Sequence, residues 1–160
     1  MAKIDPFLWF QKDCEEAVNF YVSTFEDAEI VHTTRAQEGV PGIPAGDVMT
    51  IEFSLFGQHF VALNGGPQEG FDFTSAISFV VNCDSQEEVD RYWDTLSEGG
   101  HQDACGWLTD RFGVTWQVVP RVLNEMLADE DPAKVDRVMR VMLKMSKLEI
   151  EPLEDAYHAA

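Results

Sequence analysis

Two polar side chains in this sequence are placed where they could meet a ligand. His59 lies in an alternating segment, in phase with Val61 and, by analogy between two similar hairpins, with Thr115. An imidazole on such a face could act as a general acid or base. Gln117 is an amide within an apolar strand pattern, and a buried amide needs a hydrogen-bond partner from the protein, water or a ligand. Each also has a plainer structural interpretation, because a histidine can be satisfied at a strand end and an amide can simply tie strands together.

The cysteines offer less chemistry. Cys14 falls near the start of a predicted helix, whose partial positive charge lowers a thiol pKa, but Glu15 and Glu16 beside it are expected to cancel this effect. His101 and Cys105 are four residues apart in a loop-to-strand segment, where this spacing is not a metal-ligand motif. We therefore interpret the cysteines as small core residues and expect no cofactor.

The segment that places Gln117 is CGWLTDRFGVTWQVVP, residues 105–120, which predicts two strands joined by a turn. Because strand side chains alternate, Trp116 and Val118 point one way while Thr115 and Gln117 point the other. One face is expected to pack on helices and the other to line a cavity. By the same alternation, the predicted ligand surface consists of Phe10, Ser78, Val80, Thr115 and Gln117, with His59 at its rim.

The strands and helices of the first part of the chain recur in the second. A strand at 4–10 is followed by a helix from Asp13, and a strand at 77–83 by a helix from Ser85; both helix starts match a capping-box pattern, with Glu16 and Glu88 three residues on. The sequence predicts an α+β fold in which paired βαβββ modules form curved, partly open mixed sheets. The modules fall at about 1–66 and 74–120, within a region 1–120, and a C-terminal helical extension follows at 121–160.

Composition limits the partners and the location. The 160 residues include 11 Lys or Arg and 29 Asp or Glu, and the resulting net charge of -18 makes nucleic acid and anionic membranes poor partners. A salt-adapted host is compatible with this acidity. No apolar run approaches the ~20 residues needed to cross a bilayer, and the N-terminus lacks the pattern of a signal peptide. Three cysteines at unrelated spacings favour reduced thiols and a cytoplasmic location.

The tandem modules, the opening PFLWF and EEAVNFY, and the ending ISFVVNC, CGW and DRFGVTWQVVP resemble the PhnB-like branch of the vicinal oxygen chelate superfamily. That superfamily also holds glyoxalase I, ring-cleaving dioxygenases, and fosfomycin and bleomycin resistance proteins. Proteins of this branch are often called 3-demethylubiquinone 3-methyltransferase-like. The sequence does not support that activity, because it lacks the glycine-rich loop after a strand by which Rossmann-type methyltransferases hold their cofactor.

The resemblance implies a metal site with one ligand from each of four strands. The corresponding positions here fall at Pro6, at residues 61–63, at Ala76 or Ser78, and at Gln117. Only the last offers a competent ligand, and a divalent ion needs three or four. We therefore expect no metal.

Three functions remain open at this point. The first is a metal-free homodimer that binds a small, largely apolar molecule, in which two open sheets and a methionine-rich tail favour dimerisation. The second is a glyoxalase-like or other small-molecule enzyme of the same superfamily, with His59 as its candidate catalytic residue. The third is a packing or regulatory subunit without a ligand. The sequence leaves the ligand, the pathway, the question of catalysis and any exchange of modules between subunits undetermined.

Overall fold

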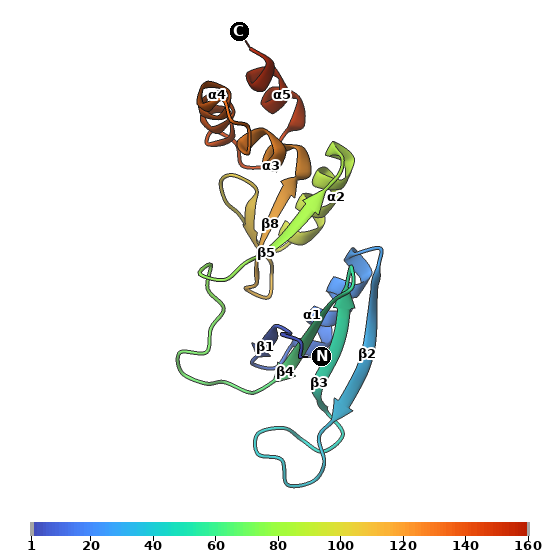
Figure 1. Cartoon of the computed structure of the whole chain (residues 1–160). Coiled ribbons are helices and arrows are strands. Elements are labelled where there is room, and N and C mark those ends of the chain that lie inside the picture. Colours follow the sequence, from blue (N-terminus) through green and yellow to red (C-terminus); the bar gives the residue numbers. More distant parts are fainter. Residues whose placement is uncertain (1, 160) are drawn as a thin grey trace. The chain divides into compact units, whose positions relative to one another are not determined.

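The computed structural model describes residues 2–159 and contains two compact units, Met1–Asp72 and Phe73–Ala160 (Figure 1). The first unit holds one helix and one four-stranded sheet. Its elements in chain order are β1 (Phe7–Phe10), α1 (Cys14–Thr24), β2 (Ala28–Arg35), β3 (Val48–Leu55) and β4 (Gln58–Asn64). The sheet order is β1-β4-β3-β2, in which β1 and β4 are parallel and the other pairs antiparallel. We call this unit module one.

One face of this sheet is covered by α1. The helix buries Val18 and Tyr21, and the Tyr21 ring stacks on Phe53 of β3 with 6.3 Å between centroids. Phe53 in turn stacks on Phe60 of β4 at 5.2 Å. These rings are removed from water, and burial of such apolar area is the main force that holds helix and sheet together.

The two predicted capping boxes have different outcomes. The Ser85 side chain accepts from the backbone N–H of Glu88 at 3.2 Å, as the pattern predicts, although the Glu88 carboxylate returns to the N–H of Asp84 at 2.7 Å. The prediction for Asp13 is wrong, because its side chain makes no capping bond. Instead Oδ1 of Asn64, 50 residues on in sequence, accepts from the Cys14 N–H at 2.9 Å. The start of α1 is thus fixed by β4.

The second unit repeats the strand order of the first. Module two consists of β5 (Phe79–Cys83), α2 (Gln86–Ser97), β6 (His101–Gln102), β7 (Trp107–Thr109) and β8 (Thr115–Pro120). Its sheet order is β5-β8-β7-β6, with β5 and β8 parallel, which matches β1-β4-β3-β2. Neither sheet closes into a barrel. The predicted α+β fold of paired βαβββ modules with a C-terminal helical extension is therefore confirmed.

The extension contains α3 (Arg121–Leu127), α4 (Pro132–Met142) and α5 (Ile150–His158). Its helices share a core with the end of β8, made of Val119, Leu123, Met126, Val138, Leu148 and Leu153. The helix α4 ends at Met142. The chain turns there because the carbonyls of Met145 and Ser146 accept from the N–H groups of Cys105 and Gly106, at 2.8 and 2.7 Å.

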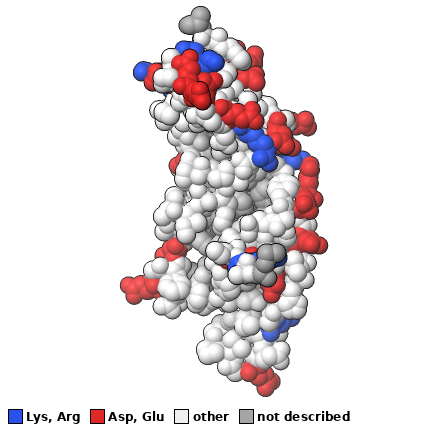
Figure 2. All heavy atoms as spheres, in the orientation of Figure 1, with Lys and Arg blue, Asp and Glu red and all other residues white. Residues whose placement is uncertain are grey.

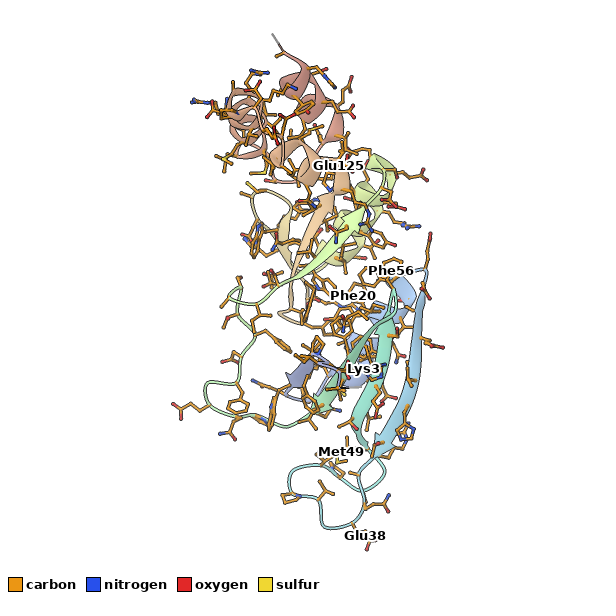
Figure 3. The ribbon with its side chains drawn as sticks, in the orientation of Figure 1. Lys3, Phe20, Glu38, Met49, Phe56 and Glu125 are labelled. Atoms are coloured by element: carbon orange, nitrogen blue, oxygen red, sulfur yellow. The ribbon has the colours of Figure 1, made fainter. Side chains whose placement is uncertain are left out.

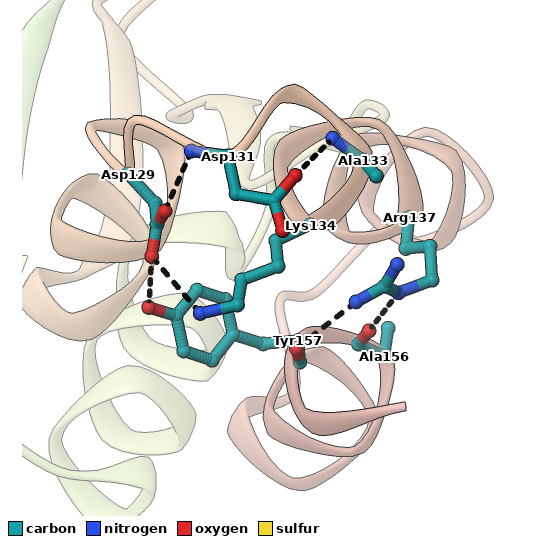
Figure 4. Close-up of polar contacts among 7 residues, drawn as sticks. All are labelled: Asp129, Asp131, Ala133, Lys134, Arg137, Ala156 and Tyr157. Atoms are coloured by element: carbon teal, nitrogen blue, oxygen red, sulfur yellow. Dashed lines mark hydrogen bonds and ion pairs between the residues drawn. The ribbon is translucent and has the colours of Figure 1, made fainter. Parts of the chain in front are cut away.

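Polar contacts join the ends of the three tail helices (Figure 4). The Tyr157 hydroxyl donates to Asp129, and Lys134 lies 3.4 Å from the same carboxylate. The bond from Tyr157 is the main cause that lowers the pKa of Asp129 below its usual range. Arg137 donates to the carbonyl of Ala156 at 3.0 Å, at the carboxyl end of α5, where a positive charge also suits the helix dipole.

Acidic side chains are spread over the surface. Figure 2 shows carboxylates gathered over the C-terminal helices, in keeping with the net charge of -18. Within residues 2–159, no helix is both long and apolar enough to cross a membrane.

Candidate functional site

Module two leaves the sheet face opposite α2 uncovered by that helix. Trp116 and Val118 of β8 are buried toward α2, as the alternation predicts. The residue between them, Gln117, therefore points away from the helix. It pairs with Val80 of β5 on one side and with Trp107 of β7 on the other. Paired residues share a face, so these three side chains form a row across three strands. We call the sheet face that carries this row the free face of module two.

Hydrogen bonds fix the polar groups of this face. Nε2 of Gln117 donates to Oγ of Ser78 at 2.9 Å, and the hydroxyls of Ser75 and Thr115 lie 3.3 Å apart. Among the described residues, none donates to Oε1 of Gln117. The amide is thus held by its nitrogen while its oxygen stays available as an acceptor, between the apolar side chains of Val80 and Trp107. Val80 is 47% exposed, so the row is open to a ligand.

The structure brings together four of the six predicted ligand residues, Ser78, Val80, Thr115 and Gln117. Their role in binding stays a prediction. Phe10 belongs to module one, where it is 2% exposed and pairs with Asn64, whose side chain bonds to the start of α1. Phe10 is accordingly part of the core between the sheet and α1 of module one, on the face opposite His59. This corrects the expected position of Phe10.

His59 lies on the free face of module one, the sheet face that points away from α1. Strand register puts further side chains on this face, namely Phe7, Trp9, Glu29, His32, Thr34, Thr50, Glu52, Ser54, Val61 and Leu63. Nδ1 of His59 is 3.5 Å from Oδ2 of Asp5, and Nε2 is 3.7 Å from Oε2 of Glu52. Both separations are those of ion-pair neighbours rather than hydrogen bonds, and Nδ1 is buried without a hydrogen-bond partner among the described residues. The role of His59 as an acid or base stays a prediction.

Sequence reasoning missed the carboxylates beside His59. Glu52 had a usable signal, since it alternates with the buried Ile51 and Phe53 and must face the same side as its neighbour across β4. Asp5 had none, because it precedes β1 and no periodic pattern includes it.

The two buried thiols, Cys14 and Cys83, do not contribute a nucleophile. Burial, followed by the nearby Glu15 charge, raises the pKa of Cys14 to about 12, and burial followed by Glu88 raises that of Cys83 to about 12. Both are therefore protonated at neutral pH, and a protonated thiol is a poor nucleophile. The sequence-based view that Cys14 is not activated agrees with this result.

The residues on the free faces do not fit a divalent metal. Gln117 is flanked by Val80 and Trp107, which have no ligand atoms suited to such an ion. The two nitrogens of His59 approach different carboxylates, so one ion cannot be shared by all three groups. No cluster of three or more His, Cys, Asp or Glu within residues 2–159 has the proximity that a metal site needs.

A hollow of about 640 Å³ lies in module two beside α2 and the start of α5. Several of its polar groups bond to one another. Lys147 pairs with Asp90 at 2.8 Å, and Gln86 accepts from the Ile150 N–H at 2.8 Å and donates to the Leu148 carbonyl at 3.2 Å. We assign these contacts to anchoring α5 on α2.

The paired βαβββ modules, each with the strand order 1-4-3-2, define the chain as a member of the vicinal oxygen chelate superfamily. Within it, residues 2–119 match the family model of 3-demethylubiquinone-9 3-methyltransferase. The match spans most of the chain, so this protein belongs to that PhnB-like family. A search of curated proteins finds no match.

Solved structures agree with this assignment. A PhnB protein from Bacillus cereus is 36% identical, with a TM-score of 0.68 over 74% of this chain and 99% of that chain. Protein PA1353 from Pseudomonas aeruginosa is 26% identical and has a TM-score of 0.59; the match covers 75% of this chain and 98% of that chain. The fosfomycin resistance protein FosX from Listeria monocytogenes, solved with Mn(II) and sulfate, is 13% identical and has a TM-score of 0.52; the match covers 79% of this chain and 96% of that chain. This last likeness is one of fold alone.

Proposed function

We propose that this protein binds a small, largely apolar molecule on the free face of module two, without a metal. The observation that carries the proposal is the Gln117 amide, whose nitrogen donates to Ser78 at 2.9 Å while no described residue donates to its oxygen. Ligand sites are typically apolar surfaces with a few fixed polar groups that set orientation. Val80 and Trp107 supply the apolar part here, and the amide oxygen selects a ligand with a hydrogen-bond donor.

The activity named by the family model is not carried over to this chain. Rossmann-type methyltransferases hold their cofactor with a glycine-rich turn between a strand and a helix. The corresponding connections here, residues 11–13 before α1 and 84–85 before α2, contain no glycine. This supports a binding protein over a methyltransferase of that kind.

The amide can be tested with two ligands that differ in one donor. We expect 2-naphthol to bind about fivefold more tightly than 2-methoxynaphthalene, which corresponds to the ~1 kcal/mol of one neutral hydrogen bond. In Gln117→Leu the two ligands should bind equally, as measured by isothermal titration calorimetry. Gln102→Leu, on the edge strand β6, is the control and should keep the difference. Equal affinities in the unaltered protein, or a difference that persists in Gln117→Leu, would contradict the proposal.

Metal content can be measured directly. We expect purified, tag-free protein to hold well under one Zn, Ni, Mn or Fe per chain, because only Gln117 offers a ligand at the four family positions. About one equivalent by elemental analysis, lost in Gln117→Ala, would instead favour the glyoxalase-like alternative.

We further propose that the protein is a homodimer. Several large apolar side chains remain exposed, including Ile77 at 74% and Leu143 at 62%, and a second copy could cover them. Sedimentation velocity at micromolar concentration should give a species of twice the 18.0 kDa chain mass. A single 18.0 kDa species would refute this.

The three unpaired cysteines also support the proposed cytoplasmic location.

A further inference from the structure

The sequence contains a single Asn-Gly pair, Asn64 and Gly65, at the carboxyl end of β4. Asparagine is a thermolabile residue, and it is most labile before glycine, where no side chain shields the following main-chain nitrogen. That nitrogen attacks the side-chain amide carbon, a succinimide ring forms, and ammonia leaves. Water then opens the ring to aspartate or to isoaspartate, in which the main chain runs through the former side chain.

Contacts within module one require an amide at position 64. Oδ1 of Asn64 accepts from the N–H of Cys14 at 2.9 Å, and Nδ2 donates to the carbonyl of Val48 at 3.0 Å. The side chain thus joins the start of α1 to the start of β3, next to Met49, which Figure 3 labels. A carboxylate accepts hydrogen bonds but donates none. Asparagine therefore satisfies both backbone groups, whereas aspartate satisfies only one.

Packing requires glycine at position 65. A Cβ on Gly65 would collide with the indole of Trp9. The indole is held in place, because its Nε1 donates to the Gly66 carbonyl at 3.0 Å and its ring packs edge-to-face with Phe71 at 4.8 Å between centroids. Gly65 also donates its N–H to the carbonyl of Phe10 at 2.9 Å. The fold thus requires both members of a chemically labile pair.

The same contacts oppose the reaction while module one is folded. Succinimide formation removes the NH₂ group of Asn64, so the carbonyl of Val48 loses this donor. It also removes the N–H of Gly65, so the carbonyl of Phe10 loses that donor. Asn64 and Gly65 are half-buried, and a polar group that loses its partner away from water destabilises the fold. The pair should therefore react mainly in molecules in which this end of β4 has opened.

We propose that Asn64 is a modification site at which deamidation makes the unfolding of module one irreversible. Aspartate at position 64 still accepts from the Cys14 N–H but has no hydrogen to donate to the Val48 carbonyl. Isoaspartate lengthens the main chain by one carbon atom before Gly65, which displaces Gly65 from its bond to Phe10. Neither product restores all of the native contacts. This inference concerns the lifetime of the fold and does not rest on the proposed ligand site.

Protection by the fold can be measured on the full chain at mildly alkaline pH, with the protein either folded or unfolded in guanidinium chloride. Peptide mapping by mass spectrometry quantifies asparagine, aspartate and isoaspartate at position 64. We expect conversion to be about tenfold or more slower in the folded protein, because only the open fraction reacts. Asn82 is the internal control: the side chain of Cys83 shields the following nitrogen, so Asn82 should convert much more slowly than Asn64 in the unfolded chain.

Refolding after removal of the denaturant tests the consequence. Chains held unfolded at mildly alkaline pH until position 64 is converted should regain less than about half of the native hydrogen-exchange protection in β3 and β4. The same chains held unfolded for the same time at mildly acidic pH, where the main-chain nitrogen attacks slowly, should regain all of it. Asn64→Gln is the matched variant, because glutamine must close a larger ring and does so slowly. It should refold equally well after either treatment.

Other results would overturn the inference. Equal conversion of the folded and unfolded protein would show that the contacts of Asn64 and Gly65 do not protect the pair. Full refolding of the converted chain would show that the modification does not block module one. A loss of refolding in Asn64→Gln after alkaline treatment would assign the damage to another residue. Should this variant fail to fold, the two pH treatments of the unaltered chain still decide the question.

Discussion

Replacing Asp110 by alanine should lower the free energy of unfolding by about 3 to 5 kcal/mol. Asp110 is 3% exposed and holds the turn between β7 and β8 together. Its Oδ1 accepts from the N–H groups of Phe112 and Val114, at 2.9 and 3.0 Å, and its Oδ2 accepts from Nε1 of Trp116 at 2.9 Å. Alanine leaves these three donors without their partner, and each buried unsatisfied donor costs ~1 to 3 kcal/mol.

Urea unfolding followed by circular dichroism measures this loss. The free energy of unfolding of Asp110→Asn should lie between those of the wild type and the alanine variant. An amide keeps one acceptor oxygen, but its NH₂ group is a donor that must face either the backbone N–H groups or the Trp116 N–H. Asp103→Ala is the matched control: that carboxylate is 45% exposed and, within residues 2–159, pairs with His101 alone, so its loss should cost under ~0.5 kcal/mol. A loss below about 1 kcal/mol in Asp110→Ala would show that water replaces the carboxylate.

The fold was predictable because its signals are local and repeated. Alternation in residues 114–119 predicted which side chains point together, and the pairing of Gln117 with Val80 and Trp107 agrees with it, although Thr115 and Val119 on the same side as Gln117 are buried. Recurrence of a strand, a helix and a hairpin in both parts of the chain then predicted two modules. The first and last strands of each module pair in parallel, β1 with β4 and β5 with β8. This pairing is a property of the βαβββ module as a whole and not of any single residue.

The position of Phe10 was not predictable from alternation. A period of two predicts which residues share a face of the sheet, but it does not predict which face packs on the helix. In β1 the two faces cannot be distinguished by polarity, because Leu8 and Phe10 on one face and Phe7 and Trp9 on the other are all apolar. The choice is made by a contact distant in sequence, in which Asn64, the partner of Phe10, bonds to the start of α1. Long-range contacts of this kind leave no local pattern.

The carboxylates beside His59 were missed for a related reason. Glu52 reaches His59 only because β3 and β4 pair with Ser54 opposite His59, which is a matter of register. Asp5 reaches it from a segment without secondary structure. The end of α4 likewise depends on distant partners, since the carbonyls of residues 145 and 146 bond to Cys105 and Gly106.

That junction carries the second large effect: Gly106→Ala should cost about 3 kcal/mol or more and loosen the tail helices. Gly106 has a φ of +82°, and a Cβ would lie 2.6 Å from the Val118 carbonyl oxygen and 3.0 Å from Cδ1 of Leu148. The backbone must shift to relieve this contact, which weakens the bonds from Gly106 to Ser146 and from Val118 to Gly106.

Gly113→Ala is the control. Its φ is +90°, but its nearest neighbour would be 3.8 Å away, so only the conformational cost of ~1 kcal/mol applies. Urea unfolding should separate the two variants by about 2 kcal/mol, and amide hydrogen exchange in α5 should accelerate in Gly106→Ala alone. Equal losses in both variants would mean that the tail gives way at no cost and does not depend on this junction.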